Sequence, residues 1–246
     1  MAWFVIMDSR NRGDEDETYL SPAMEMIPEE QERYEKMGKA FAQKLIDDYR
    51  AAGKNPYEYR LIIDNPWHPY FLPATLAAPM EGWRWPMPDA PFRNRLKGKE
   101  GRLVDIVGTS FETYAISQRV IDIIEAIEPG VHQYLPYQLI QPDGSVHPDQ
   151  RWLLNVCTRI EALDYERSNV IAMRDREHFF MDRTNDHHLV MRKSVVEGRA
   201  LWYEYRYVGT QGQFLLSDRF WNALNEAGCT GWRPANGARG RHMEEV

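Results

Sequence analysis

Prolines recur throughout residues 65–92 and limit what this part of the chain can fold into. The seven prolines are Pro66, Pro69, Pro73, Pro79, Pro86, Pro88 and Pro91. Each fixes φ and removes a backbone N–H, so a long helix or a central strand is excluded here. Trp67, Trp83 and Trp85 lie among them. A loop of this length without regular structure is uncommon and often functional, although its aromatic side chains could equally pin it to the body of the protein.

The segments around this proline-rich stretch do not alternate strictly between strand and helix. We expect a strand at residues 3–7, a helix that begins at Pro28 and ends at Gly53, and a polar connector at residues 93–102. In the second half, short strands are predicted at residues 103–107, 131–140, 152–160, 169–173, 177–182, 187–193 and 201–208. This order predicts an α+β fold with a largely antiparallel sheet, a few packed helices and a variable N-terminal part. We divide the chain into an N-terminal region, residues 1–102, and an α+β region, residues 103–246.

Two serines stand where helices would begin in the second half. Ser117 and Ser217 each precede apolar residues at helical spacing, and neither lies in the Gly-x-Ser-x-Gly motif of a nucleophilic serine. We expect both side chains to cap helices by accepting a hydrogen bond from a backbone N–H. Gly130 and Gly228 follow these apolar runs, and we expect them to end the two helices.

The formal net charge of -7 narrows the classes of partner. Phosphate groups are bound by clustered lysines and arginines, so an acidic chain disfavours a nucleic-acid ligand. The charge is compatible with a basic protein partner, although mild acidity also serves solubility alone. No apolar run is long enough to span a bilayer. Residues 1–8 lack the basic leader of a signal peptide, so we expect a cytoplasmic protein without a membrane partner.

The best enzyme-like cluster lies in residues 178–188. Histidine and aspartate are metal ligands, so a metal-dependent hydrolase is the alternative that we keep open. On a strand, however, His187 and His188 would point to opposite faces, and no His-Glu-x-x-His helix supports them. We therefore favour a polar hairpin and expect no metal at the cluster, whose members are His178, Asp182, Asp186, His187 and His188.

The two cysteines, Cys157 and Cys229, form no Cys-x-x-Cys motif. Reduced thiols fit a cytoplasmic chain, although the sequence leaves a disulfide open. Cys157 with His132 or His147 would be a thiol nucleophile with its base. The apolar neighbours of Cys157 on its predicted strand favour an inert buried thiol instead. We expect no catalytic residue and no cofactor.

Short blocks of sequence follow one another in a fixed order in the second half. They are ISQRVIDII at residues 116–124, PGVHQYLP at 129–136, WLLNV at 152–156, EALDYERS at 161–168, FLLS at 214–217, LNEAG at 224–228 and TGW at 230–232. In this order they resemble an immunity-protein family of bacterial polymorphic toxin systems, the one numbered eleven and formerly a domain of unknown function. The resemblance covers residues 103–232. It implies an antidote that binds a cognate toxin inside the producing cell, and it carries no catalytic signature.

We therefore expect an immunity protein that neutralises a toxin by binding it. A nuclease with a basic substrate groove is one toxin that would suit an acidic antidote, and an adaptor without a toxin is a weaker alternative. Tight protein interfaces use aromatic anchors together with complementary charge. The candidate interface is accordingly the three tryptophans of the proline-rich segment and an acidic run near the N-terminus: Trp67, Trp83, Trp85, Asp14, Glu15, Asp16 and Glu17.

Overall fold

The structure, a computed structural model, describes most of the second half of the chain and parts of the first. The described residues are 2–7, 19–20, 23–51, 53, 84, 87–97, 102–109, 113–172, 179–181, 189–204, 214–234 and 244–245. Within them the chain forms two larger sheets, three pairs of short strands and several helices. None of these helices is long and apolar enough to cross a membrane.

The larger sheet has six strands in the order β3-β4-β8-β9-β7-β6. Strands β4 and β8 run parallel, and the other neighbours are antiparallel. The strands are β3 (Ala23–Met26), β4 (Phe92–Lys97), β6 (Ile106–Gly108), β7 (Tyr114–Ile116), β8 (Gln133–Ile140) and β9 (Arg151–Asn155).

The second sheet has five strands in the order β10-β14-β15-β1-β16. Only its β10–β14 pair is parallel among the strands described. The strands are β1 (Ala2–Met7), β10 (Arg159–Ile160), β14 (Leu201–Glu204), β15 (Leu215–Ser217) and β16 (Trp232–Pro234). The short pairs are β2 (Tyr19–Leu20) with β5 (Arg102–Leu103), β11 (Val170–Ala172) with β12 (Phe179–Met181), and β13 (Val190–Met191) with β17 (Glu244–Glu245).

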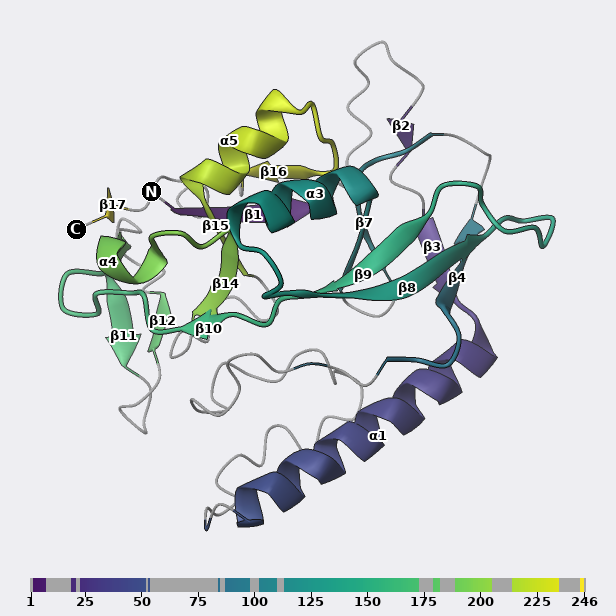
Figure 1. The fold of residues 1–246 in the computed structure, drawn as a ribbon, viewed down its shortest axis with the longest axis horizontal. Helices are drawn as coiled ribbons and strands as arrows, with labels where there is room; N and C mark the ends of the chain where they lie inside the picture. Colours follow the sequence, from purple (N-terminus) through teal and green to yellow (C-terminus); the bar gives the residue numbers. More distant parts are fainter. Residues whose placement is uncertain are drawn as a thin grey trace.

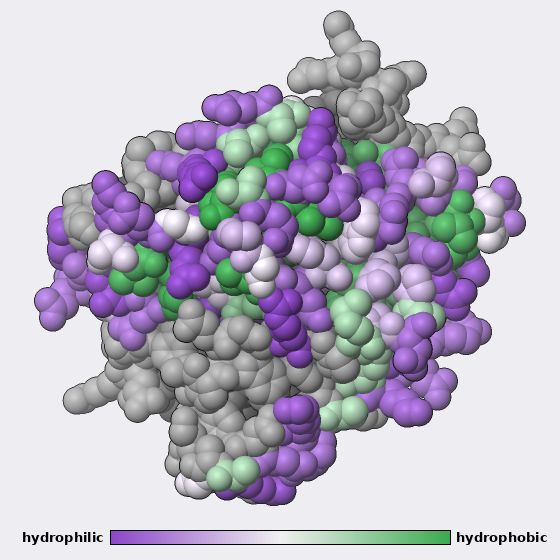
Figure 2. All heavy atoms as spheres, in the orientation of Figure 1, coloured by the Kyte–Doolittle hydropathy of each residue, from purple (hydrophilic) through white to green (hydrophobic). Residues whose placement is uncertain are grey.

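This arrangement confirms the predicted α+β fold with a largely antiparallel sheet. The helices are α1 (Pro28–Ala51), α3 (Gln118–Ile127), α4 (Lys193–Val196) and α5 (Asp218–Glu226). Figure 1 shows α3 and α5 side by side, whereas α1 lies away from them, next to β4. Hydrophobic residues that reach the surface in Figure 2 gather over α3 and α5, between hydrophilic ones. Both sheets combine strands from residues 1–102 with strands from residues 103–246, and the proposed boundary between these regions stays a prediction.

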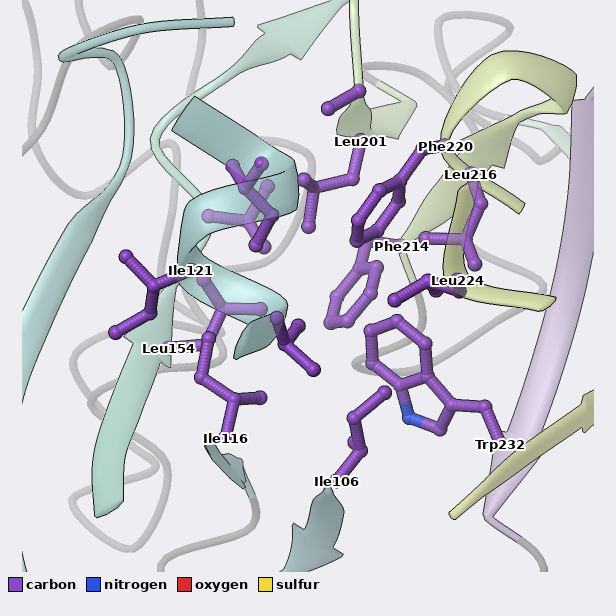
Figure 3. Close-up of a cluster of buried hydrophobic side chains, with 14 residues drawn as sticks. Ile106, Ile116, Ile121, Leu154, Leu201, Phe214, Leu216, Phe220, Leu224 and Trp232 are labelled. Atoms are coloured by element: carbon purple, nitrogen blue, oxygen red, sulfur yellow. The ribbon is translucent and has the colours of Figure 1, made fainter. Parts of the chain in front are cut away.

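The main core lies between α3, α5 and the strands that they cover. Phe214, Phe220 and Trp232 meet edge to face, with ring centroids 5.4 Å apart for Phe214 and Trp232 and 6.3 Å apart for Phe220 and Trp232. Figure 3 shows these rings in one buried cluster with Ile106, Ile116 and Leu154 of the neighbouring strands. Aromatic pairs of this kind add stabilisation beyond the apolar area that they bury. The apolar faces predicted for the two helices therefore pack into the same core.

The connector predicted at residues 93–102 is wrong for residues 93–97, and residues 98–101 lie outside the described residues. Residues 93–97 belong to β4, whose side chains alternate strictly between buried and exposed. The alternation is hidden in the sequence because a polar residue, Asn94, takes a buried position. Its Oδ1 accepts a hydrogen bond from the Tyr137 hydroxyl at 2.9 Å, which satisfies the buried amide. Arg93, Arg95 and Lys97 occupy the exposed positions of the same strand.

A buried carboxylate interrupts the strand that was predicted at residues 103–107. Asp105 separates β5 from β6 and binds three residues. Its Oδ1 accepts from the Ser117 hydroxyl at 2.9 Å, and its Oδ2 accepts from Arg119 Nη2 at 2.7 Å and from the Thr230 N–H at 3.0 Å. Burial alone would raise the pKa of Asp105, but these hydrogen bonds hold it below its ordinary value. The side chain thus joins the start of α3 to the approach to β16.

The two serines begin helices, but their side chains do different things. Ser217 Oγ accepts from the Phe220 N–H at 3.2 Å, as predicted for a cap. Ser117 stands at the N-cap position of α3 but makes no capping bond, and its hydroxyl donates to Asp105. Such a charge-assisted hydrogen bond to a carboxylate is stronger than one between two neutral groups. The predicted capping bond is therefore confirmed for Ser217 and wrong for Ser117.

The end of α5 agrees with the predicted glycine stop. The Gly228 N–H donates to the Asn225 carbonyl and the Cys229 N–H to the Leu224 carbonyl, both at 2.9 Å. This pair of bonds requires a left-handed residue after the helix, and Gly228 has φ of 65°. Gly231 is constrained more strongly. A Cβ there would lie 2.0 Å from the Ile106 carbonyl oxygen, so only glycine allows β16 to approach β6 this closely.

A second buried carboxylate, that of Glu204, holds the segment that precedes the β11–β12 pair. Its Oε2 accepts from the Ala162 N–H at 2.9 Å and from the Leu163 N–H at 3.2 Å, and its Oε1 accepts from the Tyr165 hydroxyl at 2.8 Å. Burial raises the pKa of Glu204 to about 7, because desolvation and the nearby charge of Glu161 outweigh the hydrogen bonds that favour ionisation. Glu204 therefore titrates near neutral pH inside the fold.

The different bonds of the two serines can be separated by double-mutant cycles. Ser217→Ala should cost about 1 kcal/mol of stability through the lost cap. Ser117→Ala should cost about 1 kcal/mol through the lost bond to Asp105. In urea unfolding, Ser117→Ala should couple to Asp105→Ala by about 0.5 kcal/mol or more, whereas Ser217→Ala should be additive with it. Additivity of both serines with Asp105→Ala would show that the Ser117 bond contributes nothing.

The burial of Glu204 predicts a pH-dependent stability. The folded state binds the proton with a pKa of about 7, above the ordinary value of 4.5. The free energy of unfolding, relative to Glu204→Gln, should therefore fall as the pH rises between these two values. Between about pH 4 and about pH 8, the stability of the wild-type chain relative to Glu204→Gln should fall by about 3 kcal/mol in urea unfolding. Glu166→Gln, at an exposed glutamate of the same segment, is the matched control and should show no such trend. A pH-independent difference for Glu204→Gln would contradict this assignment.

Candidate functional site

A buried polar network fixes the loop that follows α3. Glu128, just past the helix, is 4% exposed, and its Oε2 lies 3.1 Å from Nε2 of the buried His132. The same oxygen accepts from the Ala200 N–H at 2.8 Å. Its Oε1 accepts from the Thr158 hydroxyl at 3.2 Å and from Arg199 Nη1 at 2.9 Å. One carboxylate thereby ties the end of α3 to the start of β8, to the β9–β10 connection and to the entry of β14.

The donors around Glu128 keep it ionised. Burial alone would raise its pKa, but the hydrogen bonds from His132, Ala200 and Arg199 lower it to about 2. His132 Nδ1 accepts a hydrogen bond from a backbone N–H, so the proton of the neutral ring sits on Nε2 and is donated to Glu128. A buried network in which each member has a partner is rigid, and this loop is accordingly a firm support for whatever binds to it.

The structure brings Cys157 and His132 together, but not as a nucleophile and its base. His132 Nδ1 accepts from the backbone N–H of Cys157 at 3.3 Å, and the thiol donates to the Asn155 carbonyl oxygen at 3.5 Å. Burial raises the pKa of the thiol to about 11, so it is protonated at neutral pH. His147 lies in the β8–β9 loop, where its Nδ1 accepts from the Asp149 N–H. This geometry agrees with an inert buried thiol, and Cys157 and Cys229 are both free cysteines.

Of the enzyme-like cluster at residues 178–188 the structure describes only strand β12, which pairs antiparallel with β11. The polar hairpin expected at residues 178–188 stays a prediction. The candidate metal ligands His178, Asp182, Asp186, His187 and His188 lie outside the described residues. Among the residues that the structure does describe, no three His, Cys, Asp or Glu side chains are grouped to hold a metal ion.

One described residue of the proline-rich segment, Arg84, binds the loop after α3. Its Nη2 donates to the carbonyl oxygens of Gly130 at 2.6 Å and Val131 at 3.1 Å, and its Nη1 donates to that of His132 at 3.2 Å. These carbonyls follow the C-terminal end of α3, where the helix dipole favours a cation. Arg84 is therefore anchored on the loop that the Glu128 network fixes.

Neither Arg84 nor Glu128 is marked as a site residue by a pattern in the sequence. The available signal was an arginine placed between two tryptophans of a proline-rich segment. Its acceptors, however, are backbone oxygens 46 to 48 positions further along the chain, and no sequence pattern marks such partners. Glu128 is a single acidic residue after a helix, a position that is usually exposed.

All seven residues of the predicted interface lie outside the described residues. They are Trp67, Trp83, Trp85, Asp14, Glu15, Asp16 and Glu17. The structure does describe positions close to them in sequence, namely Arg84 and strand β2. Strand β2 pairs with β5, and Figure 1 shows it well apart from the loop between α3 and β8. The described positions nearest to the two candidate segments are thus held by different parts of the molecule.

Comparison with known proteins assigns the chain to a family. It matches the family described as "Immunity protein family (Imm11)" over residues 12–238. This match begins far earlier than residue 103, where the resemblance seen in the sequence blocks starts, so it includes most of the N-terminal region as well. No curated protein matches the chain. Since the family match spans nearly the whole sequence, the chain belongs to the Imm11 family of immunity proteins.

Proposed function

We propose that this chain is the antidote of a polymorphic toxin system used in bacterial competition, and that it neutralises its cognate toxin by binding it in the cytoplasm. The observation that carries the proposal is the immunity-family match over residues 12–238. Binding without catalysis is supported by the roles of the described polar groups. The Glu128 carboxylate and the Cys157 thiol are both engaged with the protein's own backbone and side chains, where they hold the fold together.

The interface that we propose is the proline-rich aromatic segment, with Trp67, Trp83 and Trp85 as candidate anchors. Prolines restrict the free chain, so less entropy is lost when a partner fixes it. Tryptophans offer a large contact area with few rotatable bonds. The anchoring of Arg84, which stands between two of these tryptophans, supports the proposal because it ties this part of the segment to a firm loop.

A second proposed contact is the acidic run of residues 14–17, which would meet a basic surface of the toxin. The net charge of -7 supports a basic partner, since opposite potentials speed encounter and fix orientation. A nuclease with a basic substrate groove is one toxin class of this kind, and another secreted effector with a basic surface would serve equally. Pull-down from cells that express the adjacent open reading frames would identify the toxin.

Neutralisation by binding predicts a stoichiometric titration. When the purified toxin is titrated with this chain, its activity should fall linearly and vanish near equimolar antidote, because each antidote molecule occupies one toxin molecule. Antidote that has been treated with a chelator is the control and should protect equally well. Loss of all toxin activity at a small fraction of an equivalent, or a change in the toxin's mass, would point to catalysis and to the hydrolase alternative.

The proposed tryptophan anchors predict a loss of affinity without a loss of folding. At least one of Trp67→Ala, Trp83→Ala and Trp85→Ala should weaken toxin binding by about 2 kcal/mol or more in calorimetry, with thermal unfolding unchanged. Trp202→Ala is the matched control for a core tryptophan, because Trp202 is fully buried, and it should cost about 3–5 kcal/mol of stability. If all three candidate variants behave like Trp202→Ala, their indoles are core residues and the interface lies elsewhere.

A further inference from the structure

The described residues that lead into β4 are held from several sides, although they form no helix or strand. We call Arg84 together with residues 87–91 the stapled segment. At one end, Arg84 donates to three carbonyl oxygens of the loop after α3. At the other end, Arg33 of α1 donates from Nη2 to the Ala90 carbonyl oxygen at 2.6 Å. Two arginines from different parts of the chain therefore fix this segment through backbone oxygens.

Both anchors of the stapled segment are themselves fixed. The loop after α3 is held by the Glu128 network and by the Gly130 N–H, which donates to Glu125 Oε2 at 2.7 Å. Arg33 lies over the Phe92 ring at 4.8 Å and 3.4 Å from Oε2 of the buried Glu30. Arg84 and Ala90 are thus both held by hydrogen bonds to other parts of the fold. A binding segment that is ordered in advance loses less entropy on binding.

Between these anchors the stapled segment exposes a large apolar side chain. Met87 is 60% exposed, and its Sδ accepts from Gln133 Nε2 of β8 at 3.7 Å. The other exposed large hydrophobic residues of the described part are Val146, at 51%, and Ile171, at 40%. Neither of these two lies beside the candidate tryptophans in the sequence. Methionine adapts its shape to an apolar recess and is overused at protein-binding surfaces.

The stapled segment also carries an exposed acidic side chain, that of Asp89. Arg84 donates to backbone oxygens, and Arg33 donates to the Ala90 carbonyl oxygen and pairs with the Glu30 carboxylate. Asp89 is exposed two residues after Met87, and it makes no ion pair with any residue that the structure describes. The segment thus offers a partner an apolar contact together with a negative charge. A recess bordered by a basic side chain would complement it.

We propose that the stapled segment is part of the toxin-binding surface, with Met87 entering an apolar recess of the toxin and Arg84 acting as the positioning residue that keeps the segment ordered. The inference rests on the proposed function, because the occupant is the cognate toxin. It deepens that proposal by naming contact and positioning residues that the aromatic pattern alone does not identify. The toxin that complements this surface carries a basic side chain beside an apolar pocket.

The test measures the affinity of the full chain for the toxin that the pull-down identifies. Met87→Ala and Arg84→Ala should each raise Kd about tenfold or more, with unchanged melting temperatures. The matched controls Val146→Ala and Arg95→Ala remove an exposed apolar residue and an exposed arginine elsewhere, and should change Kd less than about twofold. Asp89→Asn should raise Kd about threefold at low salt, and this loss should disappear at high salt.

The double variant separates a positioning role from a general structural one. Arg84→Ala/Met87→Ala should bind little more weakly than Arg84→Ala alone, because Arg84 acts through the segment that carries Met87. If Arg84→Ala fails to fold, the Kd of Met87→Ala is compared with that of Val146→Ala, and this comparison alone tests whether Met87 contacts the toxin. Wild-type affinity in both Met87→Ala and Arg84→Ala, while the wild-type chain binds and neutralises the toxin, would overturn this inference and leave the proposed function standing. A wild-type chain that neither binds nor neutralises the toxin would overturn the proposed function itself.

Discussion

The ionised carboxylate of Glu128 holds together the part of the molecule on which the candidate site depends. It is buried, and it accepts hydrogen bonds from the loop that follows α3, from the β9–β10 connection and from the residues that enter β14. A buried charge is tolerated only when its partners are complete, and removal of one partner commonly costs several kcal/mol. Because the loop that Glu128 fixes also carries the acceptors of Arg84, the same carboxylate sets the position of the stapled segment.

The sequence blocks that resemble the immunity family mostly serve the scaffold. Ser117, Arg119 and Thr230 come from two distant blocks and meet at the carboxylate of Asp105. Gly231 allows the backbone of β16 to approach β6, and Trp232 completes the aromatic core. These residues specify how α3, α5 and the sheets fit together. A shared scaffold of this kind identifies a family and leaves the recognition surface free to differ, since function lies in sites carried by a fold.

The sequence predicted those features that depend on local pattern. The fold class, the start of α1 at Pro28, the cap of α5 at Ser217 and its end at Gly228 all follow from periodicity and terminal residues. The failures named here share one cause, which is a polar side chain whose partner no local sequence pattern marks. Asn94 hides the alternation of β4 because Tyr137 satisfies it, and the hydroxyl of Ser117 is bonded to Asp105 while its oxygen caps no N–H of α3. The anchors of Arg84 escaped prediction for the same reason.

Strand β1 imposes an order of events on the production of this protein. Its residues pair with residues 215–217 on one part of the strand and with residues 232–234 on the other. Translation adds about 5–20 residues per second, so the first strand waits on the order of ten seconds or more for its neighbours to be made. Contacts so distant in sequence also slow folding after release. The supply of folded immunity protein therefore lags behind the start of its synthesis by at least this delay.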